Sequence, residues 1–452
     1  MSYAAAVDSL LMLSGELHSH PGQPRRKFRL EDMRVLMSAL GDPQLQFPSI
    51  LVAGTNGKGS TSSTLASILR AADYRVGLYT SPHLSRVNER IHISGEAIAD
   101  QAFADRYFRV HEAAEQLLKQ GSLPTLPSFF ETMTAIAFLT FAEEKVQIAV
   151  LEVGMGGRLD ATNIVEPLVS VITDISLDHT EWLGPTVDAI AREKAGILRQ
   201  NGVLVTLSQL PEANHAIGEV ATALNVRGVN AAEFMPFQPL RTWRNHYPLE
   251  VLGSVIEVDS PLAGLHQQRN IALAIAAAVE IRNDHSYNIT AAAIETGIRE
   301  TVWPGRLETF AGDGKHADIL IDVAHNPAGA WALRAALSSR DDASPSTLVF
   351  GCLADKAIAE MAQILFPCFD RVILVRVDSP RAATLDEMEA AGAATGVAIT
   401  RAKDEAEAMN MALDETPSER LIVVCGSVYL VGKVRDWISE VTSRRESARA
   451  TA

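Results

Sequence analysis

The sequence predicts an α/β protein with two domains, each built on a mostly parallel β-sheet. Two observations carry this prediction. Short apolar runs rich in Val, Ile and Leu alternate with longer segments of helical period, an order typical of parallel sheets with helices on both faces. The chain also has 452 residues, more than one hydrophobic core usually supports. We expect one domain over residues 1–300 and a smaller one over residues 301–452.

Residues 1–300 show the alternation most clearly. The apolar runs predict strands at 50–53, 75–79, 148–153, 168–175 and 203–207. The segments between them predict helices at 60–72, 101–119, 129–144 and 186–199. Alternating apolar residues between 234 and 261 indicate antiparallel hairpins, and an alanine-rich helix follows at 268–282.

A second α/β series follows the sequence Trp303-Pro304-Gly305-Arg306, which has the character of a domain junction. We expect strands at 319–323, 348–351, 372–377 and 421–425, helices at 328–337 and 357–366, and a closing helix. This unit has the length of an ordinary domain. We therefore expect this unit to form a Rossmann-like α/β domain that is smaller than the first domain.

Bulk properties exclude several classes of protein. The formal charge of −15 disfavours a nucleic acid or an anionic membrane as partner, because both would be repelled. Three cysteines without C-x-x-C spacing indicate neither a disulfide framework nor a zinc site. The N-terminal residues lack a basic leader, and no apolar run in the sequence reaches about 18 residues, the minimum for a membrane span. We expect a cytoplasmic monomer whose partners are small molecules.

The segment from Gly54 to Thr61 carries the strongest functional signal. It places Gly-Thr-Asn-Gly-Lys-Gly-Ser-Thr between an apolar strand and a helix, so that backbone N–H groups and the helix N-terminus point at one spot. Such a spot favours a polyphosphate, and we expect it to bind ATP. Lys58 would reach the β- and γ-phosphates. Gly57 and Gly59 would let the backbone approach them, and Ser60 would offer its hydroxyl to phosphate or Mg²⁺. The spacing departs from the usual phosphate loop, so a tight turn in another α/β protein is the alternative.

Further polar residues follow two predicted strands. Glu152 ends the strand at 148–153 and precedes a glycine-rich turn, so its carboxylate is presented at the edge where ligands of open α/β sheets gather. Mg²⁺ prefers such oxygen ligands beside substrate phosphate and water. Asp178 and His179 follow the strand at 168–175 and would lie at the same edge. For these two residues, a loop cap and a hydrogen-bonded structural histidine are the alternatives.

Seven motifs occur along the chain in one order and cover nearly all of it. They are Gly-Thr-Asn-Gly-Lys-Gly-Ser at 54–60, Thr-Ser-Pro-His-Leu at 80–84, the glycine-rich run 152–163, Asp-His at 178–179, Arg-Glu-Lys-Ala-Gly-Ile at 192–197, Gly-Arg at 305–306 and Asp-Val-Ala-His-Asn-Pro at 322–327. Together they resemble the motifs of folylpolyglutamate synthase and the bifunctional dihydrofolate synthase of bacteria, in the Mur-ligase superfamily. The resemblance implies a P-loop ATP-binding domain, a C-terminal α/β domain and an active site between them.

The resemblance also implies an ATP-dependent amide ligase. It would add L-glutamate to dihydropteroate, to the γ-carboxylate of a reduced folate, or to both, through an acyl phosphate that domain closure protects from water. ATP would be the co-substrate and Mg²⁺ the cofactor, with a monovalent cation as a further candidate. Two alternatives stay open: another Mur-superfamily ligase that acts on a non-folate acid, and a nucleotide-binding regulator without ligase activity.

The resemblance assigns residues to each ligand. ATP would contact the loop Asn56, Gly57, Lys58, Gly59 and Ser60, together with Asn270, Arg306 and Asp322. Mg²⁺ would be held by Ser60, Ser81, Glu152 and His179. Catalysis would involve Lys58, Lys194 as a carbamoylated lysine that supports Mg²⁺, and His325 beside Asn326. The pterin or pteroate group would lie near Leu30, Glu31, Phe129, Phe130, Glu131, Leu159, Asp160 and Ala161.

Simpler interpretations apply to several of these residues. Phe129 and Phe130 fit a hydrophobic core. Lys194 fits a solvated lysine paired with Glu193 or another neighbour. Asp322 and Asn326 fit helix caps.

Overall fold

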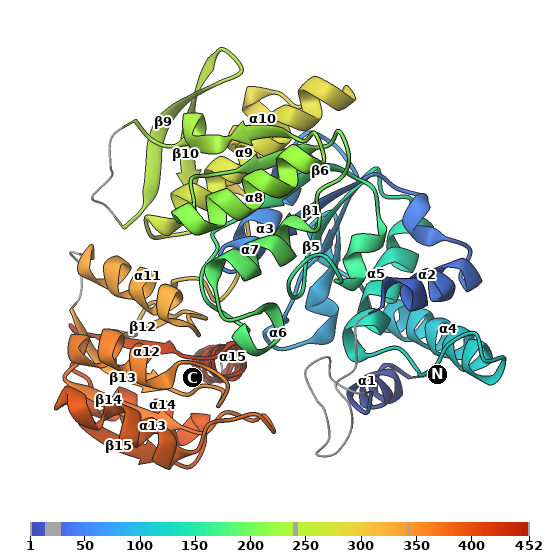
Figure 1. Ribbon diagram of the computed structural model, residues 1–452. Coiled ribbons are helices and arrows are strands. Elements are labelled where there is room, and N and C mark those ends of the chain that lie inside the picture. Colours follow the sequence, from blue (N-terminus) through green and yellow to red (C-terminus); the bar gives the residue numbers. More distant parts are fainter. Residues whose placement is uncertain (1, 14–28, 238–242, 341–343, 451–452) are drawn as a thin grey trace.

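Two sheet-containing units and a small hairpin make up the fold, shown in Figure 1. The structure, a computed structural model, describes residues 2–13, 29–237, 243–340 and 344–450. In Figure 1 the first unit runs from blue to yellow and the second from orange to red. Within these described ranges, no helix is both long and apolar enough to cross a membrane.

The first unit is built on an eight-stranded sheet. Its strands lie in the order β4 (Glu96–Ala97), β3 (Ile91–Ile93), β2 (Val76–Tyr79), β5 (Ile148–Glu152), β1 (Ser49–Ala53), β6 (Pro167–Ile172), β7 (Val203–Thr206) and β8 (Arg227–Asn230). All neighbours from β2 to β8 pair in parallel, and β3 and β4 form an antiparallel edge. The strands predicted for this region are present, within a few residues of their predicted ends.

Helices cover both faces of this sheet, as predicted. Along β1, Leu51 and Ala53 face one hydrophobic core while Ile50 and Val52 face the other, because side chains alternate along a strand. The first core is completed by α1 (Tyr3–Leu11), α2 (Leu30–Ala39), α4 (Asp100–Lys119), α5 (Phe129–Glu143), α7 (Val187–Ala195) and α8 (Pro211–Ala223). The second is completed by α3 (Lys58–Ala71), α9 (His266–His285) and α10 (Ala291–Arg299).

The strand order reverses at β1. β2 lies on one side of β1, with β5 inserted between them, whereas β6, β7 and β8 continue on the other side. In an open parallel sheet, ligands bind in the crevice outside the carboxyl ends of the strands at such a point. The loops that follow β1, β5 and β6 meet there, and these loops carry the predicted phosphate and metal residues.

The predicted hairpin is present as β9 (Asn245–Val251) and β10 (Ser254–Ser260), an antiparallel pair. Alternate residues of β9 are buried, which is the pattern that predicted it. The hairpin packs against α10 and lies at the top of Figure 1.

The second unit contains a six-stranded sheet in the order β11 (Glu308–Phe310), β12 (Asp318–Ile321), β16 (Leu421–Cys425), β13 (Pro345–Phe350), β14 (Arg371–Val375) and β15 (Ala398–Ala402). Only β11 pairs in antiparallel fashion among these described strands. The helices are α11 (Pro327–Ser338), α12 (Ile358–Leu365), α13 (Leu385–Gly392), α14 (Glu405–Glu415) and α15 (Val428–Ala450). The sequence did not predict β11, β15, α13 or α14.

Candidate active site

The predicted phosphate loop joins β1 to α3 and turns at Gly57, whose φ of +86° would strain a side chain. Gly57 also lies against Asn270, since a Cβ at position 57 would be 2.2 Å from the Asn270 Oδ1. The loop is fastened to the chain after β6: the N–H groups of Thr55 and Asn56 donate to the Asp174 carbonyl at 2.8 and 3.2 Å. This attachment explains why β6 ends earlier than predicted.

Lys58 begins α3 close to the buried carboxylate of Glu152. The Lys58 Nζ donates to the Thr55 carbonyl at 3.3 Å. Glu152 is 3% exposed at the end of β5 and accepts a hydrogen bond of 3.2 Å from the N–H of Ser81. Burial raises the pKa of Glu152, and the charges of Lys58 and Arg306 oppose that rise. The structure therefore brings the predicted residues Lys58, Ser81 and Glu152 together.

Lys194 in α7 is buried, so the interpretation as a solvated lysine is wrong. It is 3% exposed, and its Nζ donates to the Gly54 carbonyl at 2.7 Å. Glu193, its expected partner, pairs with Arg158 at 2.8 Å. Burial, together with the charge of Lys58, lowers the pKa of Lys194 to about 7. Its amine is therefore largely unprotonated, and nucleophilic, slightly above neutral pH.

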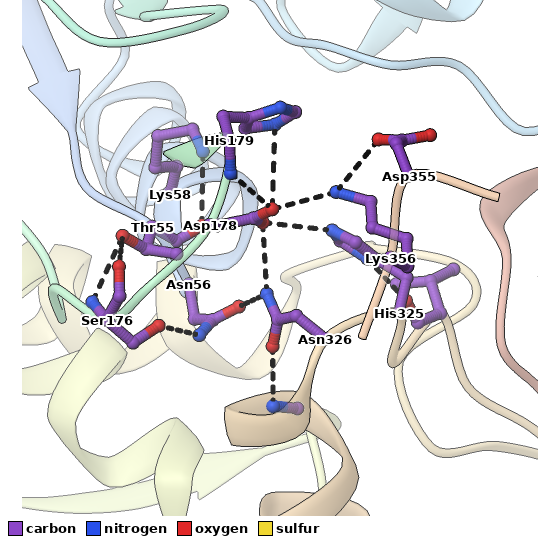
Figure 2. Close-up of polar contacts among 12 residues, drawn as sticks. Thr55, Asn56, Lys58, Ser176, Asp178, His179, His325, Asn326, Asp355 and Lys356 are labelled. Carbon is purple, nitrogen blue, oxygen red and sulfur yellow. Dashed lines mark hydrogen bonds and ion pairs between the residues drawn. The ribbon is translucent and has the colours of Figure 1, made fainter. Parts of the chain in front are cut away.

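Asp178 joins the two units, as Figure 2 shows. It follows β6, and its Oδ1 accepts a hydrogen bond of 2.8 Å from the Lys356 Nζ. Its Oδ2 accepts one of 3.2 Å from the Asn326 amide and lies 3.7 Å from the His325 Nε2. His325 and Asn326 lie after β12, and Lys356 lies after β13. The carboxyl edges of the two sheets thus meet at one carboxylate.

Asn326 also contacts the phosphate loop. Its amide donates to the Asn56 Oδ1 at 3.0 Å. Its own Oδ1 accepts from the N–H of Gly329 at 2.8 Å, which makes it the N-cap of α11. The cap interpretation is therefore correct, and the same side chain also connects the two units.

Charges of both units fix the protonation of this cluster. Burial raises the pKa of Asp178, but the neighbouring His325, Lys356 and His179 outweigh this effect and hold the pKa well below its usual range. Burial lowers the pKa of His179 to about 4, so this imidazole is neutral at neutral pH. The His325 Nδ1 lies 2.9 Å from the Val323 carbonyl, and it must be the donor because a carbonyl oxygen only accepts.

Arg306 and Asp322 lie where the first unit passes into the second. Burial lowers the pKa of Arg306, and the carboxylates of Asp322 and Glu152 oppose this effect. Asp322 accepts hydrogen bonds from the N–H groups of Leu307 and Ala324 at 2.9 and 2.8 Å. It therefore fixes the turn that holds Arg306 near Glu152.

Comparisons with known proteins agree along the chain. Residues 52–278 match the Mur ligase middle domain, and residues 305–428 match the Mur ligase glutamate ligase domain. The chain is 38% identical to the folylpolyglutamate synthase of Lacticaseibacillus casei, over 88% of this chain and 92% of that protein. It is 32% identical to the dihydrofolate synthase/folylpolyglutamate synthase of Bacillus subtilis, over 89% and 93% of the two chains.

A solved structure of Escherichia coli FolC in complex with DHPP and ADP also matches, with a TM-score of 0.82 and 30% identity over 98% of this chain and 99% of that one. The chain belongs to the folylpolyglutamate synthase/dihydrofolate synthase family of Mur ligases. Membership in this family confirms the resemblance, the predicted fold class and the predicted class of enzyme, an ATP-dependent ligase.

The segments that the family assigns to the pterin or pteroate group lie next to one another. α2, which begins at Leu30 and Glu31, packs against the short helix η3 (Ala161–Ile164), just after Leu159. η3 in turn packs against α5, which begins at Phe129. The structure thus brings together residues that are far apart in the sequence.

Several of these residues have structural roles. Phe130 is buried against Gly154, where a Cβ would lie 2.5 Å from its ring, so the core interpretation is correct for Phe130. Glu131 accepts from the N–H of Ser128 in a capping box. Asp160 holds the turn after β5 by accepting from the backbone N–H groups of Gly154, Met155 and Thr162.

The donor set at Glu152 fits Mg²⁺. Among the described residues, no group of three or more His, Cys, Asp and Glu side chains is arranged to hold a metal ion. Mg²⁺ needs only one or two protein carboxylates, because substrate phosphates and water complete its shell. The buried Glu152 supplies one carboxylate beside Ser81, and Ser60 is buried in the first turn of α3.

Sequence reasoning missed Lys356 and Arg90. Lys356 follows a predicted strand of the second domain, so the strand-end argument used for Glu152 could have found it. Arg90 ends the short helix η2 (Val87–Arg90) and is 8% exposed. Its Nε donates to the His83 Nδ1 at 2.9 Å, and its guanidinium lies 4.9 Å from the centroid of the Phe129 ring. Burial, assisted by Arg90, lowers the pKa of His83 to about 3, so His83 remains a neutral acceptor.

Proposed function

We propose that this protein is an ATP-dependent ligase that adds L-glutamate to dihydropteroate, to the γ-carboxylate of a reduced folate, or to both. One observation carries the proposal. Three side chains of the second unit converge on Asp178, one of them also contacts Asn56 of the phosphate loop, and Lys58 of the same loop lies near the buried Glu152. The names of the relatives and the DHPP and ADP bound to the similar structure support the choice of substrates.

The reaction needs two displacements. A carboxylate oxygen of the acid attacks the γ-phosphorus of ATP, ADP leaves, and an acyl phosphate forms. The amine of glutamate then attacks the acyl carbon, phosphate leaves, and the amide forms with loss of a proton. The protein's main tasks are to align these groups and to neutralise charge.

We assign the first displacement to the phosphate loop and its neighbours. The loop of residues 56–60 holds the phosphates, with Lys58 as its cation. Asn270 and Asp322 support the nucleotide. Arg306, half-buried close to Glu152, places a second cation near the transferred group.

We assign the second displacement to the loops of the second unit. The Nδ1 of His325 donates to the Val323 carbonyl and its Nε2 faces the Asp178 carboxylate at 3.7 Å, so these two contacts fix the imidazole in the crevice where the amine of glutamate would attack. Asn326 and Lys356 hold this loop against Asp178 and keep water away from the acyl phosphate.

Mg²⁺ would be held by Glu152, Ser60 and Ser81, with His179 as a further ligand, and would stabilise the charge that develops on the phosphates. Lys194 in its carbamoylated form would support this site, because its amine, with a pKa of about 7, can add CO₂ and release a proton. A monovalent cation stays a further candidate. We also propose that the two domains span 1–300 and 301–452, that the enzyme is a cytoplasmic monomer, and that Leu30, Glu31, Phe129, Phe130, Glu131, Leu159, Asp160 and Ala161 surround the pterin or pteroate group.

The test is direct. The purified protein is incubated with ATP, Mg²⁺ and radiolabelled glutamate, with either dihydropteroate or tetrahydrofolate, and ADP and labelled folate are measured. We expect ADP release that depends on the folate acid and equals the amide formed. ADP release with a peptidyl or UDP-linked acid alone would assign a different Mur ligase activity, and nucleotide binding without any amide would refute the ligase.

A further inference from the structure

Trp303 packs against the phosphate loop but has no part in the mechanism above. Its indole packs against Gly59 in the first turn of α3: a Cβ added to Gly59 would lie 2.4 Å from the Trp303 Cζ2 and 3.0 Å from its Nε1. The indole N–H therefore lies next to the backbone that the loop offers to phosphates.

The segment that carries Trp303 is firmly attached to α3. The Ser63 Oγ donates to the Val302 carbonyl at 2.9 Å. Arg70 pairs with Glu300 at 3.0 Å. These two contacts hold the segment on either side of position 301 and keep the indole close to the first turn of the helix.

The indole nitrogen is buried and makes no hydrogen bond within the described part of the chain. Leaving a buried donor unsatisfied is costly, so such a group in a folded protein calls for a partner from outside the chain. Trp303 also lines a cavity of about 610 Å³ together with Arg306. The Arg306 guanidinium lies 5.8 Å from the centroid of the indole ring. An unsatisfied donor thus lies against Gly59 of the phosphate loop, and a cation lies beside the indole that carries this donor.

We propose that Trp303 binds the nucleotide directly: its Nε1–H donates to an oxygen of ATP or ADP at the phosphate loop, and its ring holds Arg306 toward the phosphates. An anionic oxygen is the favoured acceptor, because Arg306 and the N-terminus of the 14-residue helix α3 are both electropositive. The inference rests on the proposed function only in requiring a nucleotide at this loop.

The test compares Trp303→Phe, which keeps an aromatic ring but removes the N–H, with Trp331→Phe, which changes an exposed tryptophan of α11. ADP affinity is measured by titration calorimetry, and KM for ATP and for glutamate by steady-state kinetics. For Trp303→Phe we expect ADP affinity to fall roughly tenfold and KM for ATP to rise, because the variant loses one charge-assisted hydrogen bond. KM for glutamate and thermal stability without nucleotide should stay unchanged. Trp331→Phe should match the wild type.

Wild-type ADP affinity in a folded Trp303→Phe would overturn the inference, and so would a loss of affinity matched by a loss of stability without nucleotide. Should this variant fold poorly, ¹⁵N-indole spectra of the wild type decide: ADP should shift the Nε1–H signal of Trp303, assigned after Trp→Phe changes at the other four of the five tryptophans. An unmoved signal contradicts the inference. Failure of the wild type to bind ADP would instead refute the proposed function.

Discussion

At the scale of single residues, burial decides the chemistry of Lys194. Its pKa of about 7 is far below the ordinary lysine value of 10.5, because the charged amine is costly inside α7 beside Lys58. Between about pH 7 and pH 10.5, therefore, Lys194 has lost its proton in the folded protein but keeps it in the unfolded chain. The penalty for burying the charge is fully present below pH 7 and decreases as the pH rises toward 10.5.

We predict that carbamoylation and activity both increase as the pH rises through about 7, and that added bicarbonate enhances them. Intact-mass spectrometry in bicarbonate should detect the mass of one bound CO₂. Lys194→Ala should be inactive, lose this mass and regain part of its activity with a short-chain carboxylic acid. Lys433→Ala, which changes an exposed lysine of α15, is the matched control. A Lys194→Ala variant as active as the wild type would contradict the assignment.

Glu152 is a buried carboxylate, and its burial destabilises the charged form until Mg²⁺ binds beside it. Burial raises its pKa, so the folded state holds its proton more tightly, and this residue makes the protein less stable as the pH rises above the ordinary value of 4.5. We predict that Glu152→Gln is at least as stable as the wild type at pH 8 without Mg²⁺, and loses about 10²-fold or more in rate by loss of transition-state charge stabilisation. Urea unfolding and ADP release measure the two effects. A large drop in stability would show that Glu152 is mainly structural.

At the scale of elements, Gly57 sets the junction of β1 and α3. Its φ of +86° costs a residue with a side chain about 1–2 kcal/mol, and an added Cβ would collide with Asn270. We predict that Gly57→Ala destabilises the protein by at least this amount and weakens ADP binding, as measured by urea unfolding and calorimetry. Gly218→Ala in α8 is the control, because nothing lies within 4 Å of that position. It should stabilise by roughly 0.5–1 kcal/mol, since alanine favours helices. Equal effects of both changes would contradict this account.

The elements also show what the sequence could predict. β1, β5 and most of β6 are apolar and buried, so their hydrophobic runs were visible, and their carboxyl ends gave the positions of Lys58 and Glu152. β15 is an edge strand with mostly exposed residues, and therefore lacks such a run. Lys194 was ambiguous for another reason: whether it is solvated or buried depends on Gly54, 140 residues away, and no local pattern reports that contact.

At the scale of the whole molecule, one buried ion pair, between Asp178 and Lys356, joins the two units beside the contacts of Asn326. The side chains of Asp178 and Lys356 are 9% and 7% exposed, and the residues are 178 positions apart in the chain. Removing one partner of a buried ion pair leaves the other charge unpaired, at a cost of about 3–5 kcal/mol. Separating the two units returns Asp178 to water and should require less free energy than unfolding the chain.

We therefore predict that Lys356→Met opens the enzyme without unfolding it. Small-angle scattering should show a larger radius of gyration, while far-UV circular dichroism stays unchanged. Amide formation should fall more than ADP binding, because the phosphate loop lies on the first unit and His325 on the second. Asp178→Asn in the same chain should restore part of the closed form, since it removes the unpaired charge, and Lys433→Met should behave as the wild type. A Lys356→Met enzyme that keeps its compact radius and its rate of amide formation would show that Asp178 does not hold the two units together.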